Sequence, residues 1–203
     1  MRRFLLAALV GTLVLSATAP AMARHAPASA KSAKASVTAA QPAKQAPDLR
    51  VGLASGRASL TITLAGSKAT VQTGSSKTIT LAANTAAAIR WQDGAFLVGR
   101  EKLRGEVLVI RPAAKAGELS LDGRRYRGAL ELRHKGGGLT AVNIVPVDDY
   151  LRSVVPEEMP VDWPAEAIKA QSVAARSFAL ASRGRHAGES YDLCTTTHCQ
   201  LYT

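Results

Sequence analysis

The hydrophobic pattern of the chain changes at Pro146, and this change constrains the fold more than any other feature. Before it, short segments alternate between apolar and polar residues, as β-strands with one buried face do. The clearest of these segments are residues 59–64, 78–81 and 107–110. Gly-rich sequences typical of tight turns separate the strands, at residues 65–67, 93–94, 122–123 and 136–138. Residues 126–132 and 139–145 read as a hairpin, so we expect a β-rich part over residues 48–145.

After Pro146 the pattern becomes helical. Residues 147–155 predict a short helix with acids in its first turn, where the helix dipole favours them, and Pro156 should end or kink it. A longer apolar helix follows over about residues 164–182, with Asp162 as its cap. We therefore expect an α+β fold, in which an N-terminal β-rich layer of short strands precedes an α-helical catalytic segment. That segment spans residues 146–203 and includes a Cys/His loop.

The first residues resemble an export signal. Arg2 and Arg3 precede an apolar run over residues 4–15, and small residues suited to cleavage follow at 21–23. We expect a signal peptide over residues 1–23 and export to the periplasm or cell-wall space. The apolar run is short for a membrane span, but an uncleaved signal is the alternative and would be the protein's link to the membrane.

A segment rich in Ala, Ser, Pro and Lys follows the signal. Residues 24–47 contain almost no large apolar side chain, so they predict a disordered tether, and residues 48–203 are expected to form the domain. The formal net charge of the chain is +11. In an exported protein this charge favours an acidic wall polymer or anionic lipid as partner, although it serves solubility equally well. We expect no nucleic-acid partner, because no aromatic stripe is present for stacking bases.

Two adjacent carboxylates, Glu157 and Glu158, lie between Pro156 and Pro160. A carboxylate held by stiff backbone at a helix junction suits a general acid/base, although surface acids in a solvated turn give the same pattern. Farther along, Gln171 shares the apolar arc of its helix, which makes it a structural hydrogen-bonding residue or a cleft residue.

A short segment near the C-terminus contains both cysteines of the chain, Cys194 and Cys199. His198 is adjacent to the second, and His186 lies a few residues upstream. Four such ligands suit a structural zinc site. In an exported chain, a Cys194–Cys199 disulfide is an equally good interpretation. Neither thiol has a base placed beside it by the sequence, so we do not expect a cysteine nucleophile.

Four motifs of the chain resemble the stage II sporulation protein D/amidase-enhancer (SpoIID/LytB) family. They lie in the same order as in that family, at residues 143–151, 154–160, 167–179 and 191–200. The resemblance covers roughly residues 140–203, and Tyr126-Arg127-Gly128 agrees more loosely. Family domains continue beyond the Cys-Gln-x-Tyr motif, so the resemblance also predicts that this chain is truncated within the domain.

The resemblance implies a peptidoglycan-remodelling protein with one of two activities. One is a lytic transglycosylase that cleaves bonds between N-acetylmuramic acid and N-acetylglucosamine in strands without stem peptides, leaving a 1,6-anhydro product. The other is a non-catalytic wall-binding enhancer of an N-acetylmuramoyl-L-alanine amidase. Glu158 matches the catalytic glutamate, and Arg176 and Gln171 become substrate-binding candidates. The resemblance requires no cofactor, although some members bind zinc through the Cys/His loop. Glu157 stands where many members have a small residue.

Overall fold

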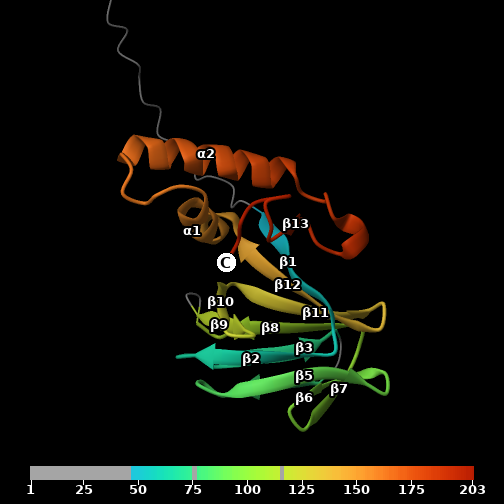
Figure 1. The fold of residues 1–203 in the computed structure, drawn as a ribbon. Helices are drawn as coiled ribbons and strands as arrows, with labels where there is room; N and C mark the ends of the chain where they lie inside the picture. The colour runs from blue at the N-terminus through green and yellow to red at the C-terminus, as the bar shows by residue number, and fades with distance from the viewer. Residues whose placement is uncertain (1–46, 75–76, 115–116) are drawn as a thin grey trace, which may run out of the picture. The chain divides into compact units, whose positions relative to one another are not determined.

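The computed structural model describes residues 47–74, 77–114 and 117–203 (Figure 1). These residues form two β-sheets, two α-helices and one short 3-10 helix, all within one compact unit. The predicted signal peptide lies outside the described residues, as does the predicted tether except for Pro47. Among the described residues, no helix is long and apolar enough to cross a membrane.

One sheet has seven strands in the order β13-β1-β12-β11-β8-β3-β4. Its strands are β13 (Leu193–Cys194), β1 (Asp48–Arg57), β12 (Gly138–Pro146), β11 (Ala129–Lys135), β8 (Val107–Pro112), β3 (Ala69–Thr73) and β4 (Thr78–Leu81). The other sheet has six strands in the order β10-β9-β2-β5-β6-β7. Its strands are β10 (Arg124–Arg127), β9 (Glu118–Leu121), β2 (Ser59–Ala65), β5 (Ala86–Gln92), β6 (Ala95–Val98) and β7 (Glu101–Arg104). Most neighbours are antiparallel, and β13 pairs in parallel with β1.

The alternating pattern of the strands produces the core. In β2, Leu60, Ile62 and Leu64 are buried while the residues between them are exposed, because successive side chains of a strand point to opposite faces. Leu130 and Leu132 of β11, in the other sheet, belong to the same cluster of buried side chains. The two sheets therefore share one hydrophobic core.

Three predicted turns are two-residue hairpin turns. Asp93-Gly94, Asp122-Gly123 and Gly136-Gly137 connect paired strands, and every one of these residues has a positive φ. Positive φ at both positions defines a type I′ turn, whose twist matches that of the flanking strands. The predicted strand over residues 126–132 is interrupted at Gly128, where a Cβ would lie 2.2 Å from the carbonyl oxygen of Ile144. Here the chain passes from one sheet to the other.

The predicted α+β class is wrong, because the described residues are mostly β-sheet and no separate helical segment exists. Three strands that the sequence did not predict, β5, β6 and β7, lie between residues 86 and 104. Ala and charged residues there mask the alternation of apolar and polar side chains. The end of the chain also contributes a strand. The Asp192 N–H donates to the Arg50 carbonyl at 2.7 Å, and the next two residues pair with β1 as β13. Cys194 of the Cys/His loop therefore lies at the edge of the seven-stranded sheet.

Two helices follow β12, namely α1 (Val147–Glu158) and α2 (Ala165–Ala181), and a 3-10 helix, η1, spans Ala187–Glu189. Helix α1 lies between α2 and the ends of β1 and β12 (Figure 1). It continues past Pro156 to Glu158, so Pro156 does not end it. Pro156 removes one N–H donor and crowds the carbonyl four residues earlier, and the helix ends two residues after it. Asp162 does not cap α2; Pro164 occupies the N-cap position without a side-chain hydrogen bond.

Candidate functional site

The last turn of α1 presents Glu158 to solvent. Its Oε2 accepts a hydrogen bond from Nε2 of Gln171, in the middle of α2, at 2.6 Å. Gln171 is half-buried, so the amide anchors an exposed carboxylate to the neighbouring helix. The carboxylate of Glu157 accepts a hydrogen bond from the Thr203 hydroxyl. The two adjacent acids therefore point to different partners, and the structure brings only Glu158 together with Gln171.

Arg176 lies elsewhere on the helix pair. Its Nη1 donates to Oδ1 of Asp148, in the first turn of α1. Asp148 and Glu158 are ten residues apart on one helix, which corresponds to about 15 Å along its axis. The structure thus pairs Arg176 with the start of α1 and Gln171 with its end, and it does not bring Arg176 next to Glu158.

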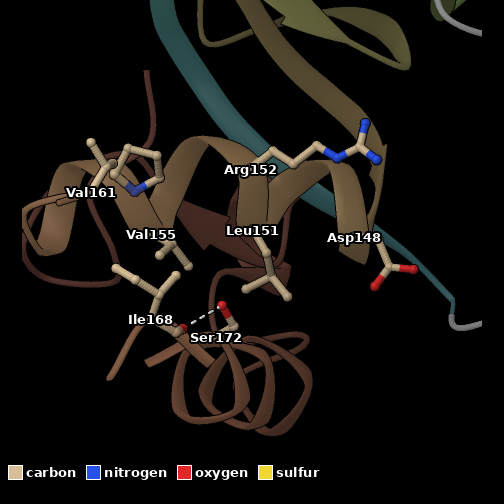
Figure 2. Close-up of a pocket in the computed structure, with 8 residues that line it drawn as sticks. Asp148, Leu151, Arg152, Val155, Val161, Ile168 and Ser172 are labelled. Atoms are coloured by element: carbon tan, nitrogen blue, oxygen red, sulfur yellow. Dashed lines mark hydrogen bonds between the residues drawn. The ribbon is translucent and has the colours of Figure 1, made fainter. Parts of the chain in front are cut away.

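A groove of about 380 Å³ runs between the two helices (Figure 2). Leu151 and Val155 of α1 face Ile168 and Ser172 of α2, and Val161 lies at one end. The Ser172 hydroxyl donates to the Ile168 carbonyl at 2.8 Å, so it is satisfied within its own helix. The groove lining is largely apolar, and Glu158 is not part of it although Val155 and Pro156 are.

The four sequence-predicted metal ligands converge in space. Ligand atoms of His186, Cys194, His198 and Cys199 all lie within 4.8 Å of one another. The two sulfur atoms are 2.8 Å apart, and His186 Nε2 lies 3.3 Å from the sulfur of Cys199. Both cysteines are free thiols in the structure. The cluster therefore joins His186, which precedes η1, Cys194 of β13, and two residues of the turn after β13.

The two thiols have different acidities. Burial opposes ionisation of Cys194, but hydrogen bonds to Cys199, Thr196 and His198 outweigh it and lower the pKa of this thiol to about 6. Burial, together with its hydrogen bond to Cys194, raises the pKa of Cys199. A thiolate is the form of cysteine that binds metal. The donor set, two sulfurs and two imidazole nitrogens within 4.8 Å, fits a tetrahedral zinc ion.

Asp192 fixes this loop to the sheet. Its Oδ2 accepts from the Arg50 N–H at 3.0 Å, and its Oδ1 accepts from the Gly184 N–H at 2.9 Å. The Arg50 guanidinium in turn forms two hydrogen bonds with Glu131, at 2.6 and 3.0 Å, and donates to the Ser190 carbonyl. The geometry of the Cys/His cluster therefore depends on an ionic network anchored in β1 and β11.

A buried hydrogen-bond network holds α1 against the sheet, and the sequence analysis did not identify it. Asn143, which is fully buried in β12, donates to the carbonyls of Arg127 and Ala129 and accepts from the Tyr202 hydroxyl at 2.5 Å. The ring of Tyr202 stacks on that of Tyr150, with centroids 5.0 Å apart. An amide inside an apolar strand was the available signal, because a buried amide must find partners.

These features define a β-rich domain with two helices at one end, an exposed glutamate anchored by a glutamine, and a Cys/His cluster. Residues 135–203 match the family model described as stage II sporulation protein (SpoIID). The family resemblance predicted from the motifs is therefore confirmed over these residues.

Two curated proteins are similar to part of the chain. An uncharacterized protein of Brachyspira hyodysenteriae is 38% identical over 84 residues, which cover 41% of this chain and 23% of that protein. The amidase enhancer of Bacillus subtilis is 32% identical over 87 residues, which cover 41% of this chain and 12% of that protein. The chain thus spans less than a quarter of the length of either relative. No solved structure matches it.

Proposed function

We propose that this chain carries a cell-wall-remodelling domain that acts on peptidoglycan outside the cytoplasm, as a lytic transglycosylase with Glu158 as its acid/base. The family match over residues 135–203 and the similarity to a protein named amidase enhancer support a role at the cell wall. The N-terminal apolar run and its small-residue cleavage site support export. The hydrogen bond between Glu158 and Gln171 is the observation that carries the catalytic assignment.

A single carboxyl group suffices for this reaction. Glu158, as the acid, donates its proton to the glycosidic oxygen, and the bond from C1 of N-acetylmuramic acid to that oxygen breaks. The 6-hydroxyl of the same sugar then bonds to C1 and returns its proton to the Glu158 carboxylate. Ordinary glycosidases need a second carboxylate to activate water or to attack the sugar. Here the substrate supplies its own nucleophile, so one glutamate in two protonation states completes the cycle.

Gln171 is a positioning residue in this scheme. The amide donates to one carboxylate oxygen, Oε2, and leaves Oε1 available for the substrate. Because α2 holds Gln171 half-buried, the carboxylate is oriented by the rigid helix pair. The largely apolar groove that begins beside Pro156 would lie along a bound strand near the acid.

The test is mass spectrometry of the products released from purified, peptide-free glycan strands by the full-length protein. We expect products that end in 1,6-anhydro-muramic acid, and we expect Glu158→Gln to abolish them while the fold remains intact. Glu157→Gln is a matched control, because it makes the same chemical change one residue earlier, and it should retain cleavage. Cleavage that survives Glu158→Gln would refute the assignment.

A non-catalytic enhancer of a wall amidase is the second candidate function. The name of the Bacillus subtilis relative favours it, and so does the exposure of Glu158, since acids that act in glycoside cleavage generally occupy less exposed settings. This candidate predicts that an amidase digests wall fragments faster in the presence of the protein, and equally so with Glu158→Gln. Stimulation without any anhydro product would favour it over the transglycosylase.

We also propose that His186, Cys194, His198 and Cys199 hold a structural zinc ion. A bound zinc would supply a cross-link between the η1 loop and β13, and all four positions would be filled by protein, as in closed structural sites. The Cys194–Cys199 disulfide remains the competing arrangement. The catalytic scheme requires no step at this cluster.

A further inference from the structure

Two neighbouring cavities share Arg133, which lies in β11 of the seven-stranded sheet, and the second cavity extends to Trp91 of the six-stranded sheet. One has a volume of about 310 Å³ and is lined in part by Arg50, Tyr191 and Asp192. The other, of about 360 Å³, is lined in part by Trp91, Glu106 and His134. Arg133 and Ser190 line both. Each volume falls in the range of small-molecule sites, roughly 300–1,000 Å³, so the pair forms a two-part depression with Arg133 at its junction.

The second cavity has a flat aromatic wall. The rings of Trp91 and His134 stack with centroids 4.6 Å apart and planes within 5° of parallel. Phe96, which is fully buried, meets Trp91 edge-on at 4.9 Å. Core packing therefore fixes Trp91, and Trp91 in turn holds the exposed imidazole of His134 flat. The negative face of an aromatic ring attracts polarised C–H groups, such as those on the flat face of a pyranose ring.

Polar groups around this wall have unused hydrogen-bonding capacity. Nε of Arg133 donates to the buried carboxylate of Glu131, which orients the guanidinium. Among the described residues, none accepts a hydrogen bond from Nη1 or Nη2 of Arg133, so these two guanidinium nitrogens can donate to a ligand. The exposed carboxylate of Glu106 likewise has no donor among the described residues. One free donor group and one free acceptor group thus flank the aromatic wall.

The charges of the depression favour a neutral ligand. Three cations line the depression, namely Arg50, Arg133 and Lys135. Three acids balance them: Glu106 and Asp192 in the lining, and the buried Glu131 that pairs with both arginines. A site for nucleic acid or an anionic polymer would present an excess of positive charge. Balanced donors and acceptors beside a flat aromatic wall instead suit a ligand with many hydroxyl and amide groups.

We propose that this depression is a carbohydrate-binding subsite for N-acetylated sugars of a β-1,4-linked wall glycan, separate from Glu158. The outer face of His134, backed by Trp91, stacks on a sugar ring. Arg133 donates to a hydroxyl or acetamido oxygen, and Glu106 accepts from hydroxyl groups. The inference rests on the proposed function for the identity of the polymer. It adds a second contact site on the β-sheet, which would hold the strand while the helix pair acts on it.

The experiment is titration calorimetry with a β-1,4-linked hexasaccharide of N-acetylglucosamine, using the full-length protein with Glu158→Gln to prevent turnover. We expect His134→Ala and Arg133→Gln each to weaken binding about tenfold, as the loss of one stacking or hydrogen-bonding contact does. Arg125→Gln is the matched control, because Arg125 also pairs with a glutamate, Glu118, but lies on β10. It should leave affinity unchanged. Thermal midpoints of all variants verify folding.

Fluorescence provides an independent readout. The chain contains two tryptophans, so Trp163→Phe leaves Trp91 as the sole tryptophan. We expect the hexasaccharide to shift its emission, and the shift to persist in high salt because a neutral ligand releases few counterions. Wild-type affinity in both His134→Ala and Arg133→Gln would overturn the subsite, as would a steep salt dependence of binding. Glu158-dependent cleavage of strands with no hexasaccharide binding would overturn the subsite alone. Absence of both binding and cleavage would overturn the proposed function with it.

Discussion

Nε2 of Gln171 donates a hydrogen bond to Oε2 of Glu158 across the two helices, at 2.6 Å. The donor lies in the middle of α2 and the acceptor in the last turn of α1, where Met159 already leaves the helical conformation. An exposed glutamate at a helix end samples many rotamers, and this bond restricts it. The relative placement of α1 and α2 therefore determines where the candidate acid is presented.

Gln171→Ala tests this relationship. Removing a hydrogen bond to a charged group costs roughly 1.5–3 kcal/mol, so we expect kcat to fall by about tenfold to a hundredfold. KM should change little, because a positioning residue acts through Glu158. Ser177→Ala removes another polar group of α2, which bonds to the Val173 carbonyl of the same helix and does not line the groove, and it should leave kcat unchanged. An increase in KM at constant kcat would show that Gln171 binds sugar instead.

Asn143→Ala should destabilise the whole domain. Asn143 makes three hydrogen bonds, two of them buried, and its loss removes the amide partner of the Tyr202 hydroxyl and of two backbone carbonyls. We expect the free energy of unfolding to fall by about 3 kcal/mol, measured by urea denaturation. Tyr202→Phe deletes only one of the three bonds and should cost about 1 kcal/mol. Equal losses in the two variants would contradict the assignment of Asn143 as the central residue.

Much of the strand pattern was predictable from the sequence. The segments at residues 59–64, 78–81 and 107–110 became β2, β4 and β8 because each alternates cleanly or carries a β-branched run. Asp-Gly and Gly-Gly pairs identified three hairpin turns, since few other residues accept positive φ at both positions. The α2 helix was also predicted to within one residue at each end.

The fold class was not predictable by the same reasoning, because periodicity describes segments and not their partners. β5 contains three successive alanines and an arginine, which weaken its pattern, and β13 is only two residues long. In the candidate site, residue types indicated the Cys/His cluster and the Glu157–Glu158 pair, and the family resemblance singled out Glu158. It could not pair Arg176 with Asp148 or reveal the buried bonds of Asn143, because those contacts depend on how α1 lies against its neighbours.

Zinc binding is predicted to be stoichiometric, at one ion per chain, measured by elemental analysis after dialysis. A chelator should lower the thermal midpoint of the wild-type protein, since metal that binds only the folded state stabilises it. Cys199→Ser removes one of the four ligands and should abolish both the bound zinc and the chelator effect. A zinc-free protein whose intact mass lacks two hydrogens, restored by a reductant, would establish the Cys194–Cys199 disulfide instead.

The network around Glu131 predicts acid sensitivity. Burial disfavours the charged form of this carboxyl, but hydrogen bonds from Arg50 and Arg133 outweigh it and lower its pKa below the ordinary 4.5. A lowered folded-state pKa gives stability that is fully present above pH 4.5 and lost as pH falls through the lowered value. The urea midpoint should therefore be lower at a pH below the lowered pKa of Glu131 than at a pH above 4.5.

The dependence should be specific to Glu131. Glu131→Gln should lower stability at neutral pH, because it leaves two guanidinium groups beside a neutral partner, and it should flatten the acid limb of the profile. Glu101→Gln is the control, since Glu101 forms an ion pair with Lys77 that is about half exposed. It should preserve the wild-type profile. If Glu131→Gln loses as much stability in acid as the wild-type protein does, other carboxyl groups cause the acid sensitivity.

Arg176 was expected to bind substrate, and its pairing with Asp148 allows that role to be separated from a structural one. The Asp148 side chain is 72% exposed, so the ion pair should contribute less than about 1 kcal/mol to stability. If Arg176 binds the strand, Arg176→Ala should raise KM about tenfold at constant kcat. Asp148→Asn should leave KM unchanged or lower it, because it frees the guanidinium. If the two variants change stability equally and neither changes KM, the role of Arg176 is structural, as an ion pair that links α1 to α2.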